Sequence, residues 1–88
     1  MAYEVEYTAT ALRQLRKLDR QVARRIVDFL DEASGLDDPH SRGKALVGDR
    51  AGIWRYRVGD YRVLCEIRDA ELVILALAVG HRGDIYDS

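Results

Sequence analysis

The 88-residue sequence contains one cysteine, Cys65, and one proline, Pro39. A single cysteine cannot build a disulfide framework, and no Cys/His cluster stands near it to complete a zinc site. So little cysteine is typical of a reducing compartment. With 48% hydrophobic residues, the chain is neither disordered nor collagen-like. We therefore expect a folded protein in which Cys65 is a packed thiol.

A long apolar run and an excess of charge are also missing. The longest apolar run, residues 72–79, has eight residues, whereas a membrane-spanning helix needs about 20. No charged stretch followed by an apolar run opens the chain, so we expect no targeting segment. The 14 basic and 15 acidic residues nearly cancel, which argues against a non-specific nucleic-acid binder. We expect a cytoplasmic protein that avoids membranes and forms a single domain over residues 1–88.

Hydrophobic periodicity predicts a strand, two helices and then three strands. Residues 3–7 alternate apolar and acidic side chains, as in a strand with one buried face. Thr8 and Asp19 are placed to cap two helices with apolar stripes, and Gly35 ends the second helix. A connecting loop follows. The three later strands are expected at residues 53–58, 61–68 and 71–79, joined by two-residue turns at 59–60 and 69–70.

The expected fold class is therefore α+β, with the element order β-α-α-β-β-β. The helical hairpin should pack on one face of a small, mostly antiparallel twisted sheet. The face that it covers is predicted from the alternation of the first two strands of the meander. It consists of Trp54, Tyr56, Val58, Tyr61, Val63, Cys65 and Ile67.

The opposite face of the same strands gathers arginines. A two-residue turn at Gly59-Asp60 pairs Arg57 with Arg62 and brings Arg55 to the same face. Like charges directly across a strand pair cost up to about 1 kcal/mol, which a merely solvent-facing surface would not need. The side chains could extend into water or pair with nearby acids. We favour a phosphate-binding cluster, because the guanidinium fork suits bidentate contacts to phosphate.

The second predicted turn, at residues 69–70, extends this face. It pairs Arg62 with Leu77 and Leu64 with Leu75. An exposed apolar floor beside the arginines would then suggest a surface covered by a base-bearing substrate or a protein helix. The residues expected on that floor are Val73, Leu75, Leu77 and Val79.

The C-terminal segment 79–86 adds His81, Arg82 and Tyr86 near the arginines of the hairpin. Histidine and arginine serve phosphoryl chemistry, and tyrosine serves base stacking. The residue types therefore suit phosphoryl chemistry and base stacking, and they leave the substrate open.

The order of elements and several motifs resemble the RelE toxins of the RelE/ParE superfamily, over the whole chain. The opening residues 1–3 and the helix 11–18 fit the resemblance as well. The motifs are Trp54-Arg55-Tyr56-Arg57-Val58-Gly59, Asp60-Tyr61-Arg62-Val63-Leu64 and the terminal Val79-Gly80-His81-Arg82-Gly83-Asp84-Ile85-Tyr86.

The resemblance implies the toxin of a type II toxin-antitoxin system that inhibits translation in the stress response. Such toxins are endoribonucleases, or mRNA interferases, that cut messenger RNA in the A site of the 70S ribosome. A RelB-like antitoxin neutralises the toxin, and operator DNA is reached only through the antitoxin complex. In this reaction the 2′-hydroxyl attacks the adjacent phosphate, so neither a metal nor another cofactor is expected.

The resemblance also implies roles for individual residues. Arg55 and Arg62 would clamp the phosphate, with Arg57 positioning the 2′-hydroxyl. Arg82 would stabilise the transition state or the leaving group. Tyr86 would stack on or orient the nucleotide.

The general base is an open question in this sequence. The best-known members have lysines where Arg55 and Arg57 stand here, and an arginine with a pKa above about 12 is a poor base. His81 ordinarily titrates near neutrality, so one hypothesis makes it the general base or acid. The other leaves it a surface histidine in a loop.

Two other functions fit the same fold, because fold alone does not decide function. One is a ParE-like inhibitor of DNA gyrase. The other is a catalytically weak toxin that acts mainly as antitoxin partner and co-repressor, which the missing lysines would favour. The joint presence of Arg62, Arg82 and Tyr86 favours the nuclease.

Overall fold

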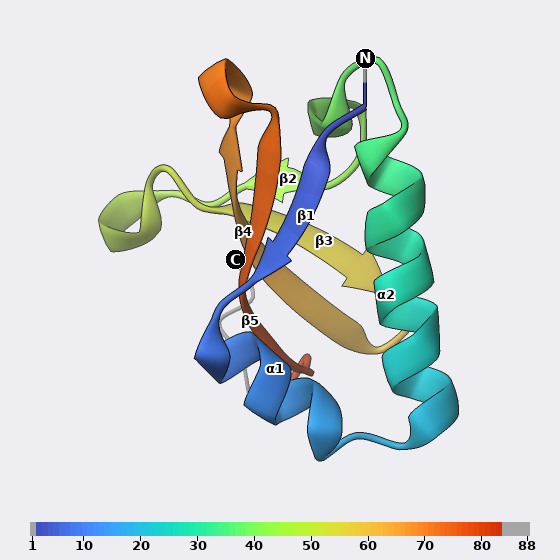
Figure 1. Cartoon of the computed structure of the whole chain (residues 1–88). Coiled ribbons are helices and arrows are strands. Elements are labelled where there is room, and N and C mark those ends of the chain that lie inside the picture. Colours follow the sequence, from blue (N-terminus) through green and yellow to red (C-terminus); the bar gives the residue numbers. More distant parts are fainter. Residues whose placement is uncertain (1, 84–88) are drawn as a thin grey trace.

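The structure is a computed structural model that describes residues 2–83, in which two helices pack on a five-stranded sheet (Figure 1). The sheet order is β1-β5-β4-β3-β2; β1 runs parallel to β5, and the other pairs are antiparallel. The predicted α+β class is confirmed. The elements are β1 (Glu4–Tyr7), α1 (Ala9–Arg16), α2 (Arg20–Ser34), β2 (Lys44–Ala45), β3 (Trp54–Val58), β4 (Tyr61–Arg68) and β5 (Val73–His81).

Both helices begin at the predicted caps. The Thr8 hydroxyl accepts a hydrogen bond from the Ala11 N–H at 3.1 Å, and the Asp19 carboxylate accepts one from the Gln21 N–H at 2.9 Å. Each such cap contributes about 1 kcal/mol. Thr8 also donates its hydroxyl proton to the carbonyl of Leu77 at 2.9 Å, which fixes the start of α1 against β5.

The core lies between the helices and the predicted apolar face of the sheet. Ile26 and Leu30 of α2 are fully buried against the sheet side chains Tyr56, Val63 and Cys65. Trp54, Tyr61 and Ile67 pack around this cluster while partly exposed. The face predicted from strand alternation is therefore confirmed. Within residues 2–83 no helix is long and apolar enough to cross a membrane.

The buried ionisable groups of this core predict a loss of stability at alkaline pH. Burial raises the pKa of the Cys65 thiol from 9.0 to about 12 and that of the Tyr7 phenol from 10.0 to about 12. In the unfolded chain the thiol ionises at pH 9.0 and the phenol at pH 10.0, whereas in the folded chain both stay neutral until about pH 12. Their contribution to the free energy of unfolding is therefore complete below pH 9.0 and is lost as the pH rises towards 12. For the thiol, the free energy of unfolding falls by about 1.4 kcal/mol for each pH unit in this range.

Urea unfolding at a series of pH values from neutral to alkaline measures this decline. The Cys65→Ala variant should lose stability less steeply above pH 9 than the natural chain. An identical slope in the two proteins would show that the thiol does not ionise on unfolding.

The segment predicted as a loop, residues 36–52, contains a fifth strand. It holds 3₁₀ turns at Pro39–Ser41 and Gly48–Arg50, with β2 between them. β2 is only two residues long and pairs Lys44 with Arg55 and Ala45 with Trp54. Two residues are too few for a period-two pattern, which is why periodicity missed the strand.

The connection between β4 and β5 differs from the predicted two-residue turn. The chain reverses over a 3₁₀ turn at Asp69–Glu71 followed by Leu72, whose φ of 56° is left-handed. Leucine rarely adopts this conformation. β5 consequently starts at Val73 rather than at residue 71, and it continues through His81.

The register of β5 on β4 is corrected accordingly. Arg62 pairs with Gly80 and Leu64 with Ala78, not with Leu77 and Leu75. The longer reversal moves the pairing by two residues, and an irregularity between Leu64 and Cys65 moves it by one more.

The irregularity also changes which residues of β5 share the arginine face. Residues paired across two strands lie on the same face of the sheet. Val73 pairs with Arg68 and Leu75 with Glu66, so these two β5 residues lie on the arginine side, as predicted. Val79 pairs with Val63 and is instead part of the core. Val73 is itself buried, and Leu75 and Leu77 are half-buried, so the predicted exposed floor of four residues is wrong.

Candidate functional site

The first hairpin has the predicted register and turn. β3 and β4 pair Arg57 with Arg62 and Arg55 with Leu64, so the three arginines lie on the sheet face opposite the apolar core face. Gly59 has a φ of 60° while Asp60 keeps a negative φ, as a type II′ turn requires. The sequence prediction of one arginine face is confirmed. We call Arg55, Arg57 and Arg62 the arginine face.

Two of these arginines are buried. Arg62 is 3% exposed and Arg55 5% exposed. One guanidinium nitrogen of Arg62 donates to the carbonyls of Gly59 at 3.3 Å and Tyr61 at 3.2 Å, which anchors the side chain to the hairpin turn. Removing a charge from water is expensive, so a guanidinium buried on a sheet is held by its surroundings in one place.

Arg57 has a different environment. It is exposed, and it lines a surface pocket of about 400 Å³ with Arg25, Asp28 and Glu32 of α2. The like-charge pair is therefore relieved in two ways. Arg62 binds backbone carbonyls, and Arg57 lies in solvent beside the acidic residues of α2.

Arg82 follows the end of β5 and is exposed. Its backbone N–H donates to the carbonyl of Asp60 at 2.9 Å, so the residue is held against the turn that anchors Arg62. The structure thus places Arg82 next to the first hairpin, as the sequence predicted. Tyr86, the other candidate in the C-terminal segment, lies outside the described residues.

His81 lies on the other face of the sheet. It pairs with Tyr61, and in β4 Tyr61 alternates with Arg62, so the register directs His81 to the helix side. The two rings meet edge to face at 5.4 Å and 89°. Nδ1 of His81 accepts from the Gly83 N–H at 3.3 Å, which holds the ring at the end of β5. Among the described residues, His81 does not join the arginine face.

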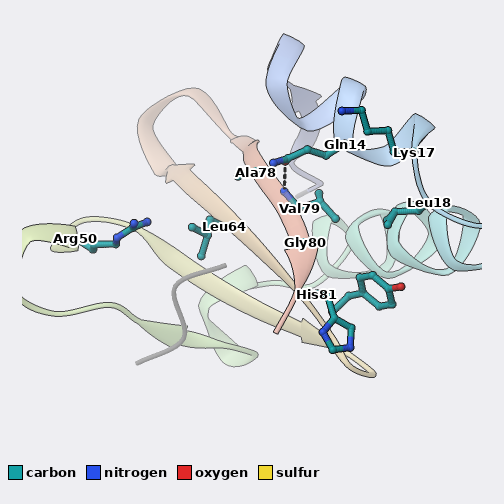
Figure 2. A pocket seen from close by; sticks show the side chains of 10 residues that line it. Gln14, Lys17, Leu18, Arg50, Leu64, Ala78, Val79, Gly80 and His81 are labelled. Atoms are coloured by element: carbon teal, nitrogen blue, oxygen red, sulfur yellow. Dashed lines mark hydrogen bonds between the residues drawn. The ribbon is translucent and has the colours of Figure 1, made fainter. Parts of the chain in front are cut away.

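A cavity of about 460 Å³ lies at the end of β5 (Figure 2). Gln14 of α1 lines it and accepts a hydrogen bond from the Val79 N–H at 2.6 Å. Sequence reasoning missed Gln14, because 65 residues separate the two partners and no local pattern joins them. The residues that line the cavity are Gln14, Lys17, Leu18, Arg50, Tyr61, Leu64, Ala78, Val79, Gly80 and His81.

The described residues offer cationic side chains for a ligand, and no metal-binding cluster. Across residues 2–83, no group of three or more His, Cys, Asp or Glu side chains is placed to hold a metal ion. The cationic side chains on or beside the arginine face, whose charge suits an anionic substrate, are Arg55, Arg57, Arg62 and Arg82.

Comparison with known proteins defines the class to which this fold and site belong. The family described as ParE toxin of the type II toxin-antitoxin system, parDE, matches residues 5–86, and the chain belongs to it. The match runs from β1 through the arginine face and the C-terminal segment.

The relatives place the chain among the RelE-like toxins of the RelE/ParE superfamily. It is 39% identical over 88 residues to toxin RelG of Mycobacterium tuberculosis, covering 98% of each chain. A chain of the RelBE2 toxin-antitoxin complex from the same organism has a TM-score of 0.85 and 35% identity, over 96% of this chain and 95% of that one. The archaeal RelE-RelB complex of Pyrococcus horikoshii gives a TM-score of 0.73 and 27% identity, over 97% and 100%.

Proposed function

We propose that this toxin is a metal-independent endoribonuclease that cuts messenger RNA in the ribosomal A site. The observation that carries the proposal is the burial of Arg55 and Arg62 on one sheet face, with Arg82 held against the same turn. Fixed cations are suited to a transition state in which negative charge builds on phosphoryl oxygens. The similarity to toxins of the RelE group supports the same activity.

The proposed reaction is attack by the 2′-hydroxyl on the adjacent phosphate. Arg62 and Arg55 hold the non-bridging oxygens, which requires the substrate to open the surface over these two buried side chains. Arg82 is exposed beside the hairpin turn, where it neutralises charge on the leaving 5′-oxygen. Arg57 positions the 2′-hydroxyl, and Tyr86 is proposed to orient the nucleotide.

The register changes the proposal for the general base. Because the register turns His81 towards the helix side, we propose that it does not take the proton of a 2′-hydroxyl bound at Arg57. As the P–O2′ bond forms and the P–O5′ bond breaks, the 2′-hydroxyl gives its proton to solvent water and the leaving 5′-oxygen takes one from water, while the arginines supply electrostatic stabilisation and positioning. These effects can accelerate a reaction without a base of matched pKa.

The proposed partner is a RelB-like antitoxin, since relatives of known structure are complexes of RelB with RelE. An antitoxin segment that covers the half-buried Leu75 and Leu77 and brings carboxylates to the arginine face would neutralise the site. Binding of operator DNA is proposed only for the complex, because the toxin itself has a net charge of −1.

A reconstituted translation reaction tests the proposal. We expect the purified toxin to cut a defined message on 70S ribosomes with a vacant A site, to leave the same RNA intact without ribosomes, and to retain activity in the presence of a transition-metal chelator. Added antitoxin should stop the cleavage. An intact message after incubation with folded toxin and ribosomes would rule the activity out.

A second candidate function is inhibition of DNA gyrase, because the matching family carries the ParE description. It requires no phosphate-cleaving site. Supercoiling by purified gyrase, measured in parallel with the ribosome reaction, separates the two functions. Inhibited supercoiling with an uncut message would favour the ParE-like activity, and neither effect would leave a toxin that acts mainly as antitoxin partner and co-repressor.

A further inference from the structure

The last part of β5, residues 77–81, lies beyond the end of β1, and α1 takes the place of a neighbouring strand there. β1 pairs with β5 from Val73 to Ala76, and beyond these residues the start of α1 contacts β5 through Thr8, whose hydroxyl donates to the Leu77 carbonyl. Gln14 accepts from the Val79 N–H at this point. The cavity of about 460 Å³ lies along this part of β5, and we call it the β5-end pocket.

The β5-end pocket joins the two faces of the sheet. On one side its lining includes Leu64 and Gly80, which the register places on the arginine face. On the other side it includes Tyr61 and His81, which lie towards the helices. A single-stranded chain bound on the arginine face can therefore pass around the end of β5 and place its next unit beside His81.

The chemistry of the pocket suits a nucleobase with its phosphate. Leu18 and Val79 supply apolar surface, and the edge-to-face rings of Tyr61 and His81 supply an aromatic wall. Lys17 adds a cation at the lining. Flat aromatic surface next to positive charge is how proteins hold single-stranded RNA, and the volume falls within the usual range of ligand sites, roughly 300–1,000 Å³.

We propose that the β5-end pocket seats the base adjacent to the scissile phosphate and that His81 is its stacking surface. The path of the RNA in this proposal rests on the proposed nuclease function. The Gly83 N–H donates to Nδ1, which leaves the flat face of the imidazole and its Nε2 edge to a bound base. His81 thereby touches substrate through its ring and takes no part in transferring the 2′-hydroxyl proton.

Two substitutions of His81 separate stacking from proton transfer. His81→Phe keeps a flat ring and removes titration, while His81→Ala removes both. We expect His81→Phe to cleave within about threefold of the natural toxin, and His81→Ala to raise KM for the programmed ribosome about tenfold with little change in kcat, as loss of one base stack implies. His40→Ala, at the only other histidine of the sequence, is the matched control and should behave like the natural chain.

The pH profile of cleavage completes this test. Natural toxin and His81→Phe should show the same dependence on pH across the range where imidazole titrates. Equal losses of kcat in the two variants, with disappearance of the acidic limb of the profile, would overturn the proposal and make His81 the general base.

Ligand binding tests the pocket without any cleavage. In an NMR titration of the full chain, adenosine monophosphate should shift the signals of Leu18, Tyr61 and His81, and ribose 5-phosphate at the same concentration should not. Equal shifts with both compounds would show that the pocket binds phosphate and not the base, which contradicts the proposal. No shift with either compound would show that the pocket binds no nucleotide. Shifts with an acidic antitoxin peptide but none with the nucleotide would assign the pocket to the antitoxin.

The two experiments distinguish the failure of the pocket from the failure of the nuclease. If no message is cut but adenosine monophosphate titrates the pocket, the proposed function is wrong and the nucleotide site stands. If messages are cut while both His81 variants retain their KM and the titration is silent, the nuclease stands and the pocket proposal is wrong.

Discussion

Arg62→Ala is expected to lower the rate of message cleavage on the ribosome by at least about 100-fold, the usual effect of removing one group that stabilises developing charge. The side chain is 3% exposed and fixed to the carbonyls of Gly59 and Tyr61, so no flexible neighbour can take its position. Single-turnover cleavage of a defined message measures the loss. A melting curve of each variant shows whether the fold is retained.

The matched control is Arg68→Ala. Arg68 lies on the same strand and the same face, but it is exposed and pairs with the carboxylates of Glu66 and Glu71 at the far end of β4. We expect it to cleave within about threefold of the natural toxin, because exposed ion pairs contribute little. Arg62→Lys should recover part of the rate by restoring the charge without the fork. Normal cleavage by Arg62→Ala would show that the phosphate is bound elsewhere.

Gly43→Ala is expected to destabilise the protein by about 2–4 kcal/mol, from left-handed strain and steric overlap together. Gly43 has a φ of 84°, and a Cβ there would lie 2.4 Å from the Arg55 carbonyl oxygen and 2.6 Å from Nε1 of Trp54. The close approach lets Trp54 donate to the Arg42 carbonyl at 2.7 Å. Chemical denaturation measures the change in the free energy of unfolding.

Gly48→Ala separates the two causes. Gly48 also has a left-handed φ, 70°, but nothing lies within 4 Å of the position of an added Cβ. This variant should lose only about 1 kcal/mol, the strain of the backbone conformation. Equal losses in the two variants would mean that the contact with Arg55 and Trp54 relaxes freely.

The first hairpin could be predicted from the sequence because a two-residue turn leaves little freedom. Gly59 supplies the left-handed φ that the turn needs, and the turn then fixes every pair back to Trp54 and Cys65. The arginine face follows from alternation alone. The helices were equally predictable, because the capping side chains Thr8 and Asp19 act within three residues of themselves.

The second hairpin could not be predicted in the same way. Its reversal uses Leu72 in a conformation that sequence rules assign to glycine, and the irregularity between Leu64 and Cys65 has no local signature. Both are set by tertiary packing. A single extra residue moves side chains to the other face, which is why Val79 lies in the core and His81 on the helix side.

The contacts of α1 with the end of β5 also bear on self-association. An uncovered strand edge offers free N–H and C=O groups to any other chain, and is a common start of aggregation. Gln14 and Thr8 occupy such groups at Val79 and Leu77. They do so with side chains, which cannot extend a ladder from one molecule to the next. A toxin parted from its antitoxin thus keeps this stretch of β5 closed to the backbone of a second chain.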